Sequence, residues 1–530
     1  MQSHSFQFTH PSQEIGGEWS VTPSSENGSF GVNFYGSEKL PDSTELVAQF
    51  QKIVDNRFAR WIMTRMTEQK KFEHILGVFA GVESAHSMRE STQSRVLEAA
   101  LKRGMKTFHV ENMDVIKGAL KEKFVRKGVA LTLRSVAKYG ITKPQKFDAP
   151  LMIVWNTTKL CNLNCKHCYA NAGVKSRDEM TLEQKLQVID KFDEVGVTMI
   201  AFSGGEPLMS PDFWKIAEYA SNKGIYTTIA TNGTLLTKSA VDRLAEVGIK
   251  YVEISLDSAD PKIHNEFRGQ KMAWERTVDG IKNVVEKGVF DNAIATTATK
   301  YNYKNMDKML DLAISLKVKR FIVFNFVPTG RGKEIINEDL SPKEREELLT
   351  FLYDKWQEKV GPEIYSTSPE YSRIGINKVL EGSGKTYSPT HFVPMEAGSN
   401  GIAMAEFLGG CGAGRIYAAL EDNGDLEPCV FLPIKVGNVL KSDFNEIWRN
   451  SKVFQDLRNR DELEGVCGTC PFKYSCGGCR ARAYGYFGDY MQSDPGCVLN
   501  EKAYEEVVIK LSNEVKVSTK DEDLATVPTN

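Results

Sequence analysis

The 530-residue sequence predicts an α/β fold built on an open, mostly parallel sheet. Between residues 150 and 330, short apolar runs rich in β-branched and aromatic residues alternate with amphipathic stretches of helical period. Such alternation is typical of parallel strands joined by right-handed helical crossovers. We count six strand–helix units, fewer than the eight of a closed barrel, so we expect a partial, TIM-like (β/α)6 barrel.

The elements of this barrel are expected in regular order. The strands are predicted at 151–156, 198–204, 225–233, 251–257, 293–299 and 321–328. The helices between them are predicted at 182–195, 212–223, 238–247, 273–287 and 305–316. Ligands bind at the carboxyl ends of the strands in sheets of this kind, so polar residues just past strand ends are the first candidates for a site.

The sequence before the barrel differs from it in composition and in predicted secondary structure. Residues 1–44 are rich in Ser, Gly, Asn and Pro, which predicts a loop-rich segment. Residues 45–147 predict a helical domain, with helices from Glu45, near 94–102 and over 113–139. Between Leu101 and Lys146 there are twelve Lys and Arg against three Asp and Glu. Such a basic stretch is most often a solvated face, but it can also contact an anionic membrane or an acidic substrate.

The remaining boundaries follow from composition. We expect the barrel at 148–335, a helical connection at 336–405, a small cysteine-rich domain at 406–500, and a terminal helix with a solvated tail at 501–530.

Composition narrows the class of protein. With 41% hydrophobic and 26% charged residues, the chain is typical of a globular protein, and its net charge of −2 does not predict binding to nucleic acid. No apolar run approaches the roughly 20 residues of a membrane span, and the N-terminus lacks a basic-then-apolar signal pattern. We therefore expect a cytoplasmic protein, in which clustered cysteines stay reduced and usually bind metal.

Three cysteines follow the first predicted strand in the run CNLNCKHC, namely Cys161, Cys165 and Cys168. Three thiolates at this spacing can hold three irons of a [4Fe–4S] cluster and leave the fourth iron open. A structural zinc site needs four closed ligands, and the next cysteine is Cys411. His167 could be a fourth ligand only by pointing opposite to its neighbours, so zinc is the weaker alternative.

This spacing, with the aromatic Tyr169 after it, resembles the hallmark of the radical S-adenosylmethionine (SAM) superfamily. A further match is the GGEP turn after the second strand, which in that family receives the amino group of SAM. Alone, such a run is as easily a plain turn, but its glycines would let the backbone approach an ammonium group and Glu206 would add negative charge. The residues that the resemblance assigns to SAM are Tyr169, Ser203, Gly204, Gly205, Glu206, Pro207, Ser255, Asp257 and Arg268.

The resemblance implies an enzyme of oxidoreductase type. Its cluster, held by three cysteines and SAM, would reductively cleave SAM to a 5′-deoxyadenosyl radical that abstracts hydrogen from an unactivated C–H bond. A low-potential electron donor, such as a ferredoxin or flavodoxin, is the implied partner. The alternative from another class is a non-catalytic iron–sulfur electron carrier or a zinc-binding protein.

The other seven cysteines lie between positions 411 and 497. Two CxxC pairs could form a zinc ribbon, but seven cysteines exceed one site and fall short of two closed ones. Their order resembles the SPASM extension of radical SAM enzymes, which implies two auxiliary [4Fe–4S] clusters. By this resemblance one cluster is held by Cys467, Cys470, Cys476 and Cys497, and the other by Cys411, Cys429 and Cys479. The interval between Cys476 and Cys479 is one residue shorter than in the common SPASM pattern. This departure concerns which of the two clusters each of these cysteines would ligate.

The sequence indicates the reaction type more closely than it indicates the substrate. SPASM enzymes mostly modify peptide or protein side chains by oxidation or crosslinking, which is the first expectation here; a tetrapyrrole or a lipid is the alternative. Sulfatase-maturing relatives carry an aspartate where this chain has Val430, which argues against that activity. The predicted N-terminal helices do not resemble the strand-containing peptide-binding domain of many peptide modifiers.

Overall fold

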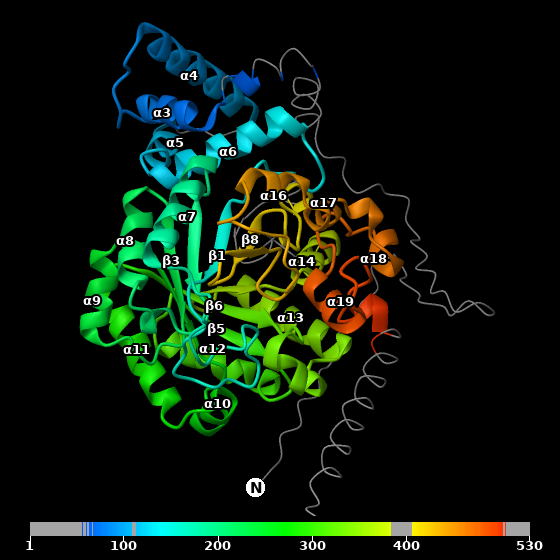
Figure 1. Ribbon diagram of the computed structural model, residues 1–530. Helices are drawn as coiled ribbons and strands as arrows, with labels where there is room; N and C mark the ends of the chain where they lie inside the picture. The colour runs from blue at the N-terminus through cyan, green and yellow to red at the C-terminus, as the bar shows by residue number, and fades with distance from the viewer. Residues whose placement is uncertain are drawn as a thin grey trace, which may run out of the picture.

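The computed structural model describes residues 56, 60, 63–65, 67–108, 113–382, 405–501 and 504 (Figure 1). The loop-rich segment expected at 1–44, the helix expected from Glu45 and the tail expected after 501 therefore lie almost wholly outside the described residues. Within the described part, a central sheet carries helices on its outer side, with a group of helices at one end and the cysteine-rich domain at its flank (Figure 1).

The sheet has ten strands in the order β10-β9-β8-β1-β2-β3-β4-β5-β6-β7. All neighbours from β8 through β1 to β7 are parallel, whereas β9 is antiparallel to both β8 and β10. The strands are β1 (Met152–Asn156), β2 (Met199–Ser203), β3 (Tyr226–Thr231), β4 (Tyr251–Ser255), β5 (Asp291–Ala298), β6 (Arg320–Asn325), β7 (Glu363–Ser366), β8 (Tyr417–Leu420), β9 (Asp425–Glu427) and β10 (Gly437–Asn438).

Amphipathic helices cover the outer face of this sheet. Their apolar sides and the outward-facing strand residues form one large core, in which Phe192, Phe202 and Leu244 are fully buried. The helices of the barrel are α7 (Leu182–Val195), α8 (Phe213–Asn222), α9 (Lys238–Glu246), α10 (Pro261–Arg268), α11 (Ala273–Lys287), α12 (Met306–Ser315), α13 (Pro342–Gln357) and α14 (Glu370–Leu380). Local signals set their ends; α7, for example, begins at a capping box formed by Thr181 and Gln184.

The predicted α/β barrel is confirmed, and its elements fall close to their expected places. Helices α7 and α11 match the predicted bounds, and all six predicted strands are present. Sequence reasoning missed β7, which lies in the segment expected to be a helical connection and pairs with β6. It also missed β8, which joins the barrel sheet from the cysteine-rich domain by pairing with β1. Both are four residues long, too short to show a clear period.

The N-terminal helical domain packs against the amino ends of the strands. It contains α3 (Gln69–Ala80), α4 (Met88–Phe108), α5 (Met113–Ala119) and α6 (Lys123–Tyr139). The single helix expected over 113–139 is thus two helices, because the chain turns at 120–122, where the Arg126 guanidinium donates to the Leu120 and Lys121 carbonyls. The Phe124 ring of α6 lies 4.8 Å from the Tyr226 ring at the start of β3.

Much of the basic stretch is paired within the fold. Lys127 is fully buried against Asp193, and Arg134 lies 3.2 Å from the carboxylate of Asp148. These ion pairs make part of the excess charge structural rather than a free basic surface. No helix in the described part of the chain is long and apolar enough to cross a membrane.

Candidate active site

A cavity of about 640 Å³ lies inside the barrel and extends to the cysteine-rich domain. Its wall includes all three cysteines of the first set, which lie in the loop between β1 and α7. The same cavity is bordered by three cysteines of the second set, namely Cys411, Cys429 and Cys479. Two groups of cysteines that are some 250 residues apart in the sequence therefore face one space.

The first cysteine loop is fixed by backbone contacts. The Cys161 amide donates to the Gly173 carbonyl at 3.2 Å, and the Asn164 amide donates to the Arg268 carbonyl at 3.2 Å. The Arg331 side chain ties the loop to the end of β6 by donating to the carbonyls of Cys165 and Ala172, at 3.0 and 2.7 Å. Main-chain hydrogen bonds and the Arg331 side chain together fix the shape of the loop.

The sulfur atoms of this loop fit the donor set of an iron–sulfur cluster. Backbone amides of Leu163 and Ala172 point at the sulfurs of Cys161 and Cys168, at 3.5 and 3.4 Å, as hydrogen bonds to cluster thiolates do. Burial raises the pKa of the Cys161 thiol to about 11, so a thiolate here needs a nearby metal cation. Across the described residues, no three His, Cys, Asp or Glu side chains converge on a single-ion site.

His167 does not behave as a fourth ligand. Its ring stacks on the Phe267 ring, with centroids 4.3 Å apart, and burial lowers its pKa to about 3. The side chain is therefore a neutral packing element beside the loop.

The GGEP turn lies directly against the cysteine loop. Gly204 has a φ of +121°, and a Cβ at Gly205 would collide with the carbonyl of Leu160. The amides of Gly205 and Glu206 donate to the Thr158 and Leu160 carbonyls, at 2.7 and 2.8 Å. Glycine is required here because two backbone segments meet without room for a side chain.

Glu206 lies behind the turn, on the side away from the cavity. Its side chain is fully buried and accepts hydrogen bonds from the Thr231 hydroxyl and the Asn232 amide, both at 2.8 Å. Burial raises its pKa to about 7. Neither Glu206 nor the buried Pro207 borders the cavity, whereas Ser203, Gly204 and Gly205 do. The carboxyl group thus organises the end of β3 behind the turn.

Asp257 and Arg268 form a buried pair behind the cysteines. The Arg268 Nε donates to Asp257 Oδ2 at 2.6 Å, and its Nη1 lies 3.8 Å from the sulfur of Cys165. Although burial opposes ionisation, the Arg268 guanidinium keeps the pKa of Asp257 below its usual value. Arg268 and Ser255 face the cavity, while Asp257 holds Arg268 from behind.

Tyr169 connects three parts of the site. Its hydroxyl lies 2.9 Å from the Ser203 hydroxyl and donates to the Asn156 side chain at 3.1 Å. Its ring makes an edge contact with Phe431 of the cysteine-rich domain, with centroids 5.0 Å apart. Asn232 and Arg331 are among the cavity residues that sequence reasoning missed. Asn232 directly follows the end of β3, which is the signal that could have identified it.

The second cysteine set divides into two groups in space. Cys411, Cys429 and Cys479 pack together in one cluster beside the cavity, where the Tyr417 hydroxyl donates to Cys429 at 3.2 Å. The Arg373 guanidinium faces both Cys476 and Cys497, and the Arg480 guanidinium donates to Cys467 at 3.5 Å. Cys470 lies near Cys467.

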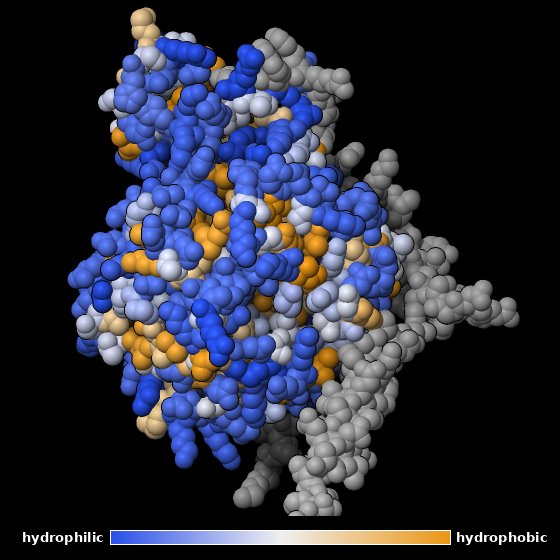
Figure 2. Space-filling model, viewed as in Figure 1, coloured by the Kyte–Doolittle hydropathy of each residue, from blue (hydrophilic) through white to orange (hydrophobic). Residues whose placement is uncertain are grey.

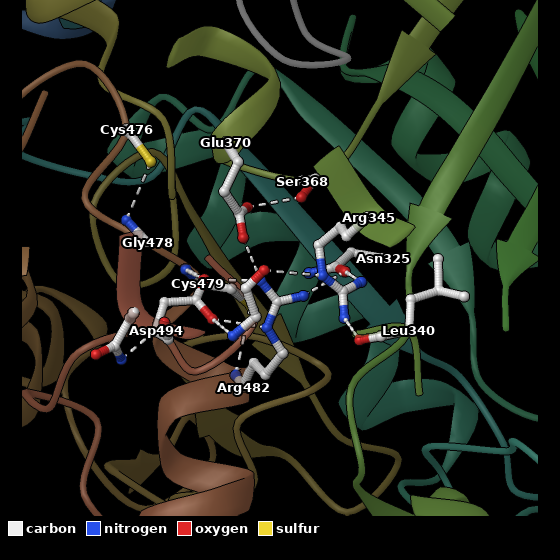
Figure 3. Close-up of polar contacts among 12 residues, drawn as sticks. Asn325, Leu340, Arg345, Ser368, Glu370, Cys476, Gly478, Cys479, Arg482 and Asp494 are labelled. Carbon is white, nitrogen blue, oxygen red and sulfur yellow. Dashed lines mark hydrogen bonds and ion pairs between the residues drawn. The ribbon is translucent and has the colours of Figure 1, made fainter. Parts of the chain in front are cut away.

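A network of buried charges joins these cysteines to the barrel (Figure 3). Arg482 donates to Asp494 at 2.7 Å and also pairs with Glu370 at the start of α14. Asp494 in turn accepts from the backbone amide of Cys479 at 2.6 Å. The charges of Arg482, Glu370 and Asp494 are at most 1% exposed, so the network is closed to solvent. It links α19 (Arg480–Phe487) to the barrel.

Comparison with known proteins gives matches over both the barrel and the cysteine-rich domain. The radical SAM superfamily model matches residues 155–313, and the model of the SPASM iron–sulfur cluster-binding domain matches 411–471. The AdoMet-dependent heme synthase of Methanosarcina barkeri is 37% identical over 352 residues, which cover 66% of this chain and 97% of that protein. The chain belongs to the radical SAM superfamily and carries a C-terminal SPASM domain. It is therefore an enzyme whose domains imply SAM and iron–sulfur clusters.

Other radical SAM proteins resemble the chain over similar spans. The mycofactocin maturase MftC of Mycobacterium tuberculosis is 31% identical over 360 residues, covering 66% of this chain and 83% of that protein. The crystal structure of Streptococcus suis SuiB bound to its precursor peptide SuiA superposes with a TM-score of 0.57 at 19% identity, covering 80% of this chain and 92% of that one. That likeness shows the shared fold.

Proposed function

We propose that this radical SAM enzyme holds SAM at the carboxyl ends of its barrel strands and abstracts hydrogen from an unactivated C–H bond of a substrate in the cavity. The observation that carries the proposal is the single cavity that borders both cysteine sets. A substrate placed there lies between the site of SAM and the SPASM domain. The alternative of a non-catalytic electron carrier or zinc protein would leave this cavity and the glycine turn without a role.

In this proposal Cys161, Cys165 and Cys168 ligate a [4Fe–4S] cluster. When bound, this cluster supplies the electron that splits SAM into methionine and a 5′-deoxyadenosyl radical. The chain contributes position and exclusion of water. Arg268, held by Asp257, places a positive charge 3.8 Å from Cys165, and the loop amides point at the other sulfurs.

The proposed binding site for SAM, called the SAM seat below, lies on the cavity side of the GGEP turn. Ser203, Gly204, Gly205, Asn232 and Ser255 all border the cavity there. The glycines expose backbone atoms that a SAM ammonium can contact, and Glu206 acts from behind by fixing Asn232. Tyr169 closes the seat toward the SPASM domain through Phe431.

The same proposal assigns the remaining cysteines to two auxiliary clusters. Cys411, Cys429 and Cys479 would hold the one beside the cavity, with an open position, and Cys467, Cys470, Cys476 and Cys497 would hold the other. The spatial grouping of the side chains supports this division despite the short interval between Cys476 and Cys479. Electrons would come from a small low-potential carrier protein.

A small molecule is favoured over a peptide as the substrate. A relative named as a heme synthase reaches higher identity, 37%, than the mycofactocin maturase at 31%. A peptide that binds by adding a strand needs a free sheet edge, and the described residues of the N-terminal domain form helices only. We therefore place a tetrapyrrole or a lipid ahead of the peptide side chain that the sequence first suggested.

The test uses enzyme reconstituted with iron and sulfide without oxygen. Three four-iron clusters predict about twelve irons per chain. With dithionite and SAM, the enzyme should release 5′-deoxyadenosine, measured by chromatography and mass spectrometry. Iron-loaded protein that never cleaves SAM would contradict the proposal, and zinc without iron would favour the binding-protein alternative. Deuterated iron porphyrins, lipids and peptides offered in parallel show which class passes deuterium into 5′-deoxyadenosine.

A further inference from the structure

The inner face of the barrel sheet is less tightly packed than its outer face. On β4, Val252 and Ile254 point outward and are fully buried under the helices. Tyr251, Glu253 and Ser255 point inward and are only half-buried, because they border the cavity. Strand β2 shows the same alternation. Interior positions of a filled barrel are normally packed by large side chains in layers, so this lumen is hollow.

The wall of the lumen changes in chemistry with depth. The level at the carboxyl ends of the strands is polar and carries Ser203, Asn232 and Ser255. The level below it is made mostly of methyl-bearing side chains; it includes Val154, Ala201, Ala230, Ala295 and Ile322. The lowest level, at the amino ends of the strands, carries Met199, Tyr226 and Tyr251, with the charged Asp291 and Arg320.

The charges at the lowest level are paired with each other. Arg320 lies 3.4 Å from Asp291 and 3.1 Å from Glu363. In the middle level Glu253 has one weak contact, from the Tyr251 hydroxyl at 3.5 Å. Burial raises the pKa of Glu253 to about 7, so its neutral form persists to near-neutral pH. The charged side chains at the lowest level thus pair with each other, and Glu253 adds no net charge below near-neutral pH.

Phe124 of α6 stands at the amino end of the lumen. Its ring borders the cavity and packs on Tyr226. The N-terminal domain, which lies outside the stretch matched by the radical SAM model, thus forms one end of the space. From Tyr226 to Ala230 the wall extends for about 13 Å at the rise of a parallel strand.

We propose that the lumen binds a hydrocarbon chain, which extends from the SAM seat past Ala201 to Phe124. The interior of an eight-stranded barrel is either filled by side chains or holds one small ligand. Here the inward side chains leave a space whose wall carries methyl groups between the polar level and Phe124, which suits an extended alkyl chain. The apolar middle level supplies the contacts, and the paired charges mark the end nearest water. This inference rests on the proposed function, since it names the substrate class of that site as a long-chain lipid or its free acid or alcohol.

Binding can be tested without any SAM chemistry. Reconstituted holoenzyme is mixed with doxyl-labelled stearate in the absence of SAM and reductant, and the immobilised fraction is measured by electron paramagnetic resonance. We expect saturable immobilisation. Ala201→Phe should weaken it by about tenfold or more, because filling the middle level displaces at least two methylenes from apolar contact. Ser239→Phe adds the same ring on the exposed surface of α9 and should bind like the parent.

Two variants of Phe124 provide an independent test if Ala201→Phe fails to fold. Phe124→Ala should lengthen the longest n-alkanol that displaces the label, and Phe124→Trp should shorten it. Displacement by free alkanols or by phosphatidylglycerol vesicles separates a free chain from a membrane lipid, and either result supports the channel. Absence of saturable binding, or displacement by an iron porphyrin and not by alkanols, would overturn it. SAM cleavage measured separately shows whether the proposed function stands regardless.

Discussion

In the loop after β1 three cysteines lie within eight residues, whereas the seven cysteines of the SPASM domain are spread over positions 411 to 497. The short loop is fixed mainly by main-chain hydrogen bonds, to Gly173, to the adjacent GGEP turn and to Arg268, and by the Arg331 side chain. Four of the SPASM cysteines lie in the run 467–479, and folding brings Cys411, Cys429 and Cys497 to them from other segments. The two sets thus depend on different kinds of interaction.

Buried arginines are the main difference between the two regions. Beside the first loop Arg268 is 7% exposed, and in the SPASM domain Arg415, Arg480 and Arg482 are fully buried. Such charges are stable only with partners, and removal of one partner is costly. The comparison teaches that main-chain hydrogen bonds set the shape of the first site, while the ion pairs of Arg482 hold the SPASM domain against the barrel (Figure 3).

The largest effect is expected from the first loop. Cys165→Ala removes one of three proposed ligands and should abolish SAM cleavage, while the SPASM cysteines still assemble their clusters. Iron should then fall from about twelve to about eight per chain, measured together with 5′-deoxyadenosine. Cys470→Ala is the counterpart: it should retain some SAM cleavage and lose product. Undiminished cleavage by Cys165→Ala would rule out the assignment of the first loop.

The next effect probes the buried network. Arg482→Met leaves Glu370 and Asp494 as unpaired buried carboxylates and should destabilise the SPASM domain by about 3–5 kcal/mol. Chemical denaturation and the resonance signals of the SPASM clusters measure this change. Lys452→Met breaks an exposed pair with Asp456 in the same domain and should cost less than about 1 kcal/mol. Equal costs for the two variants would remove the distinction between the regions.

A third effect concerns the fit between turn and loop. Gly205→Ala places a Cβ against the carbonyl of Leu160 and should displace the cysteine loop, at a cost of about 1–3 kcal/mol, with weaker SAM binding. Gly173→Ala is the matched control, because no atom lies within 4 Å of the added Cβ. Calorimetric titration with SAM measures both. Similar affinity in the two variants would show that the close approach is not needed.

Whether a feature depends on nearby or on distant residues also decides how well it could be predicted from the sequence. The barrel strands, the first cysteine loop and the GGEP turn are encoded by periods and spacings within a few residues, and the structure has them where the sequence indicated. The turn itself gives no signal for the hydrogen bonds of Glu206, because its partners Thr231 and Asn232 lie some 25 positions away. The pairing of β8 with β1 and of Arg482 with Glu370 depends on segments over 100 residues apart, for which a single sequence holds no local signal.

Part of the prediction came from the resemblance to a family and not from residue spacing. The assignment of SPASM cysteines to two groups came from resemblance, and the structure places Cys411, Cys429 and Cys479 together. The hollow lumen was not foreseen, because inward-facing residues such as Ala201 and Tyr251 look like ordinary strand residues. Only the folded sheet shows that no large side chain fills the space between them.

The smallest effect tests whether buried charge without a partner is as costly as the comparison implies. Glu253 lies in the lumen with only the Tyr251 hydroxyl near it, and burial raises its pKa from the usual 4.5 to about 7. Because the unfolded chain loses this proton at lower pH than the folded one, stability should fall as pH rises from about 4.5 to 7. Glu253→Gln removes that loss.

The gain of Glu253→Gln over the parent should therefore be absent near pH 4.5 and largest above pH 7. Its upper bound is about 3 kcal/mol, reduced because the side chain borders the cavity and is only half-buried. Denaturation of both proteins across this pH range measures the difference. Thr228→Ser, at a neighbouring inward position, is a control that should show no such pH dependence. A gain that is constant with pH would mean that Glu253 ionises freely and that the lumen is wet, which would weaken the case for a hydrocarbon chain.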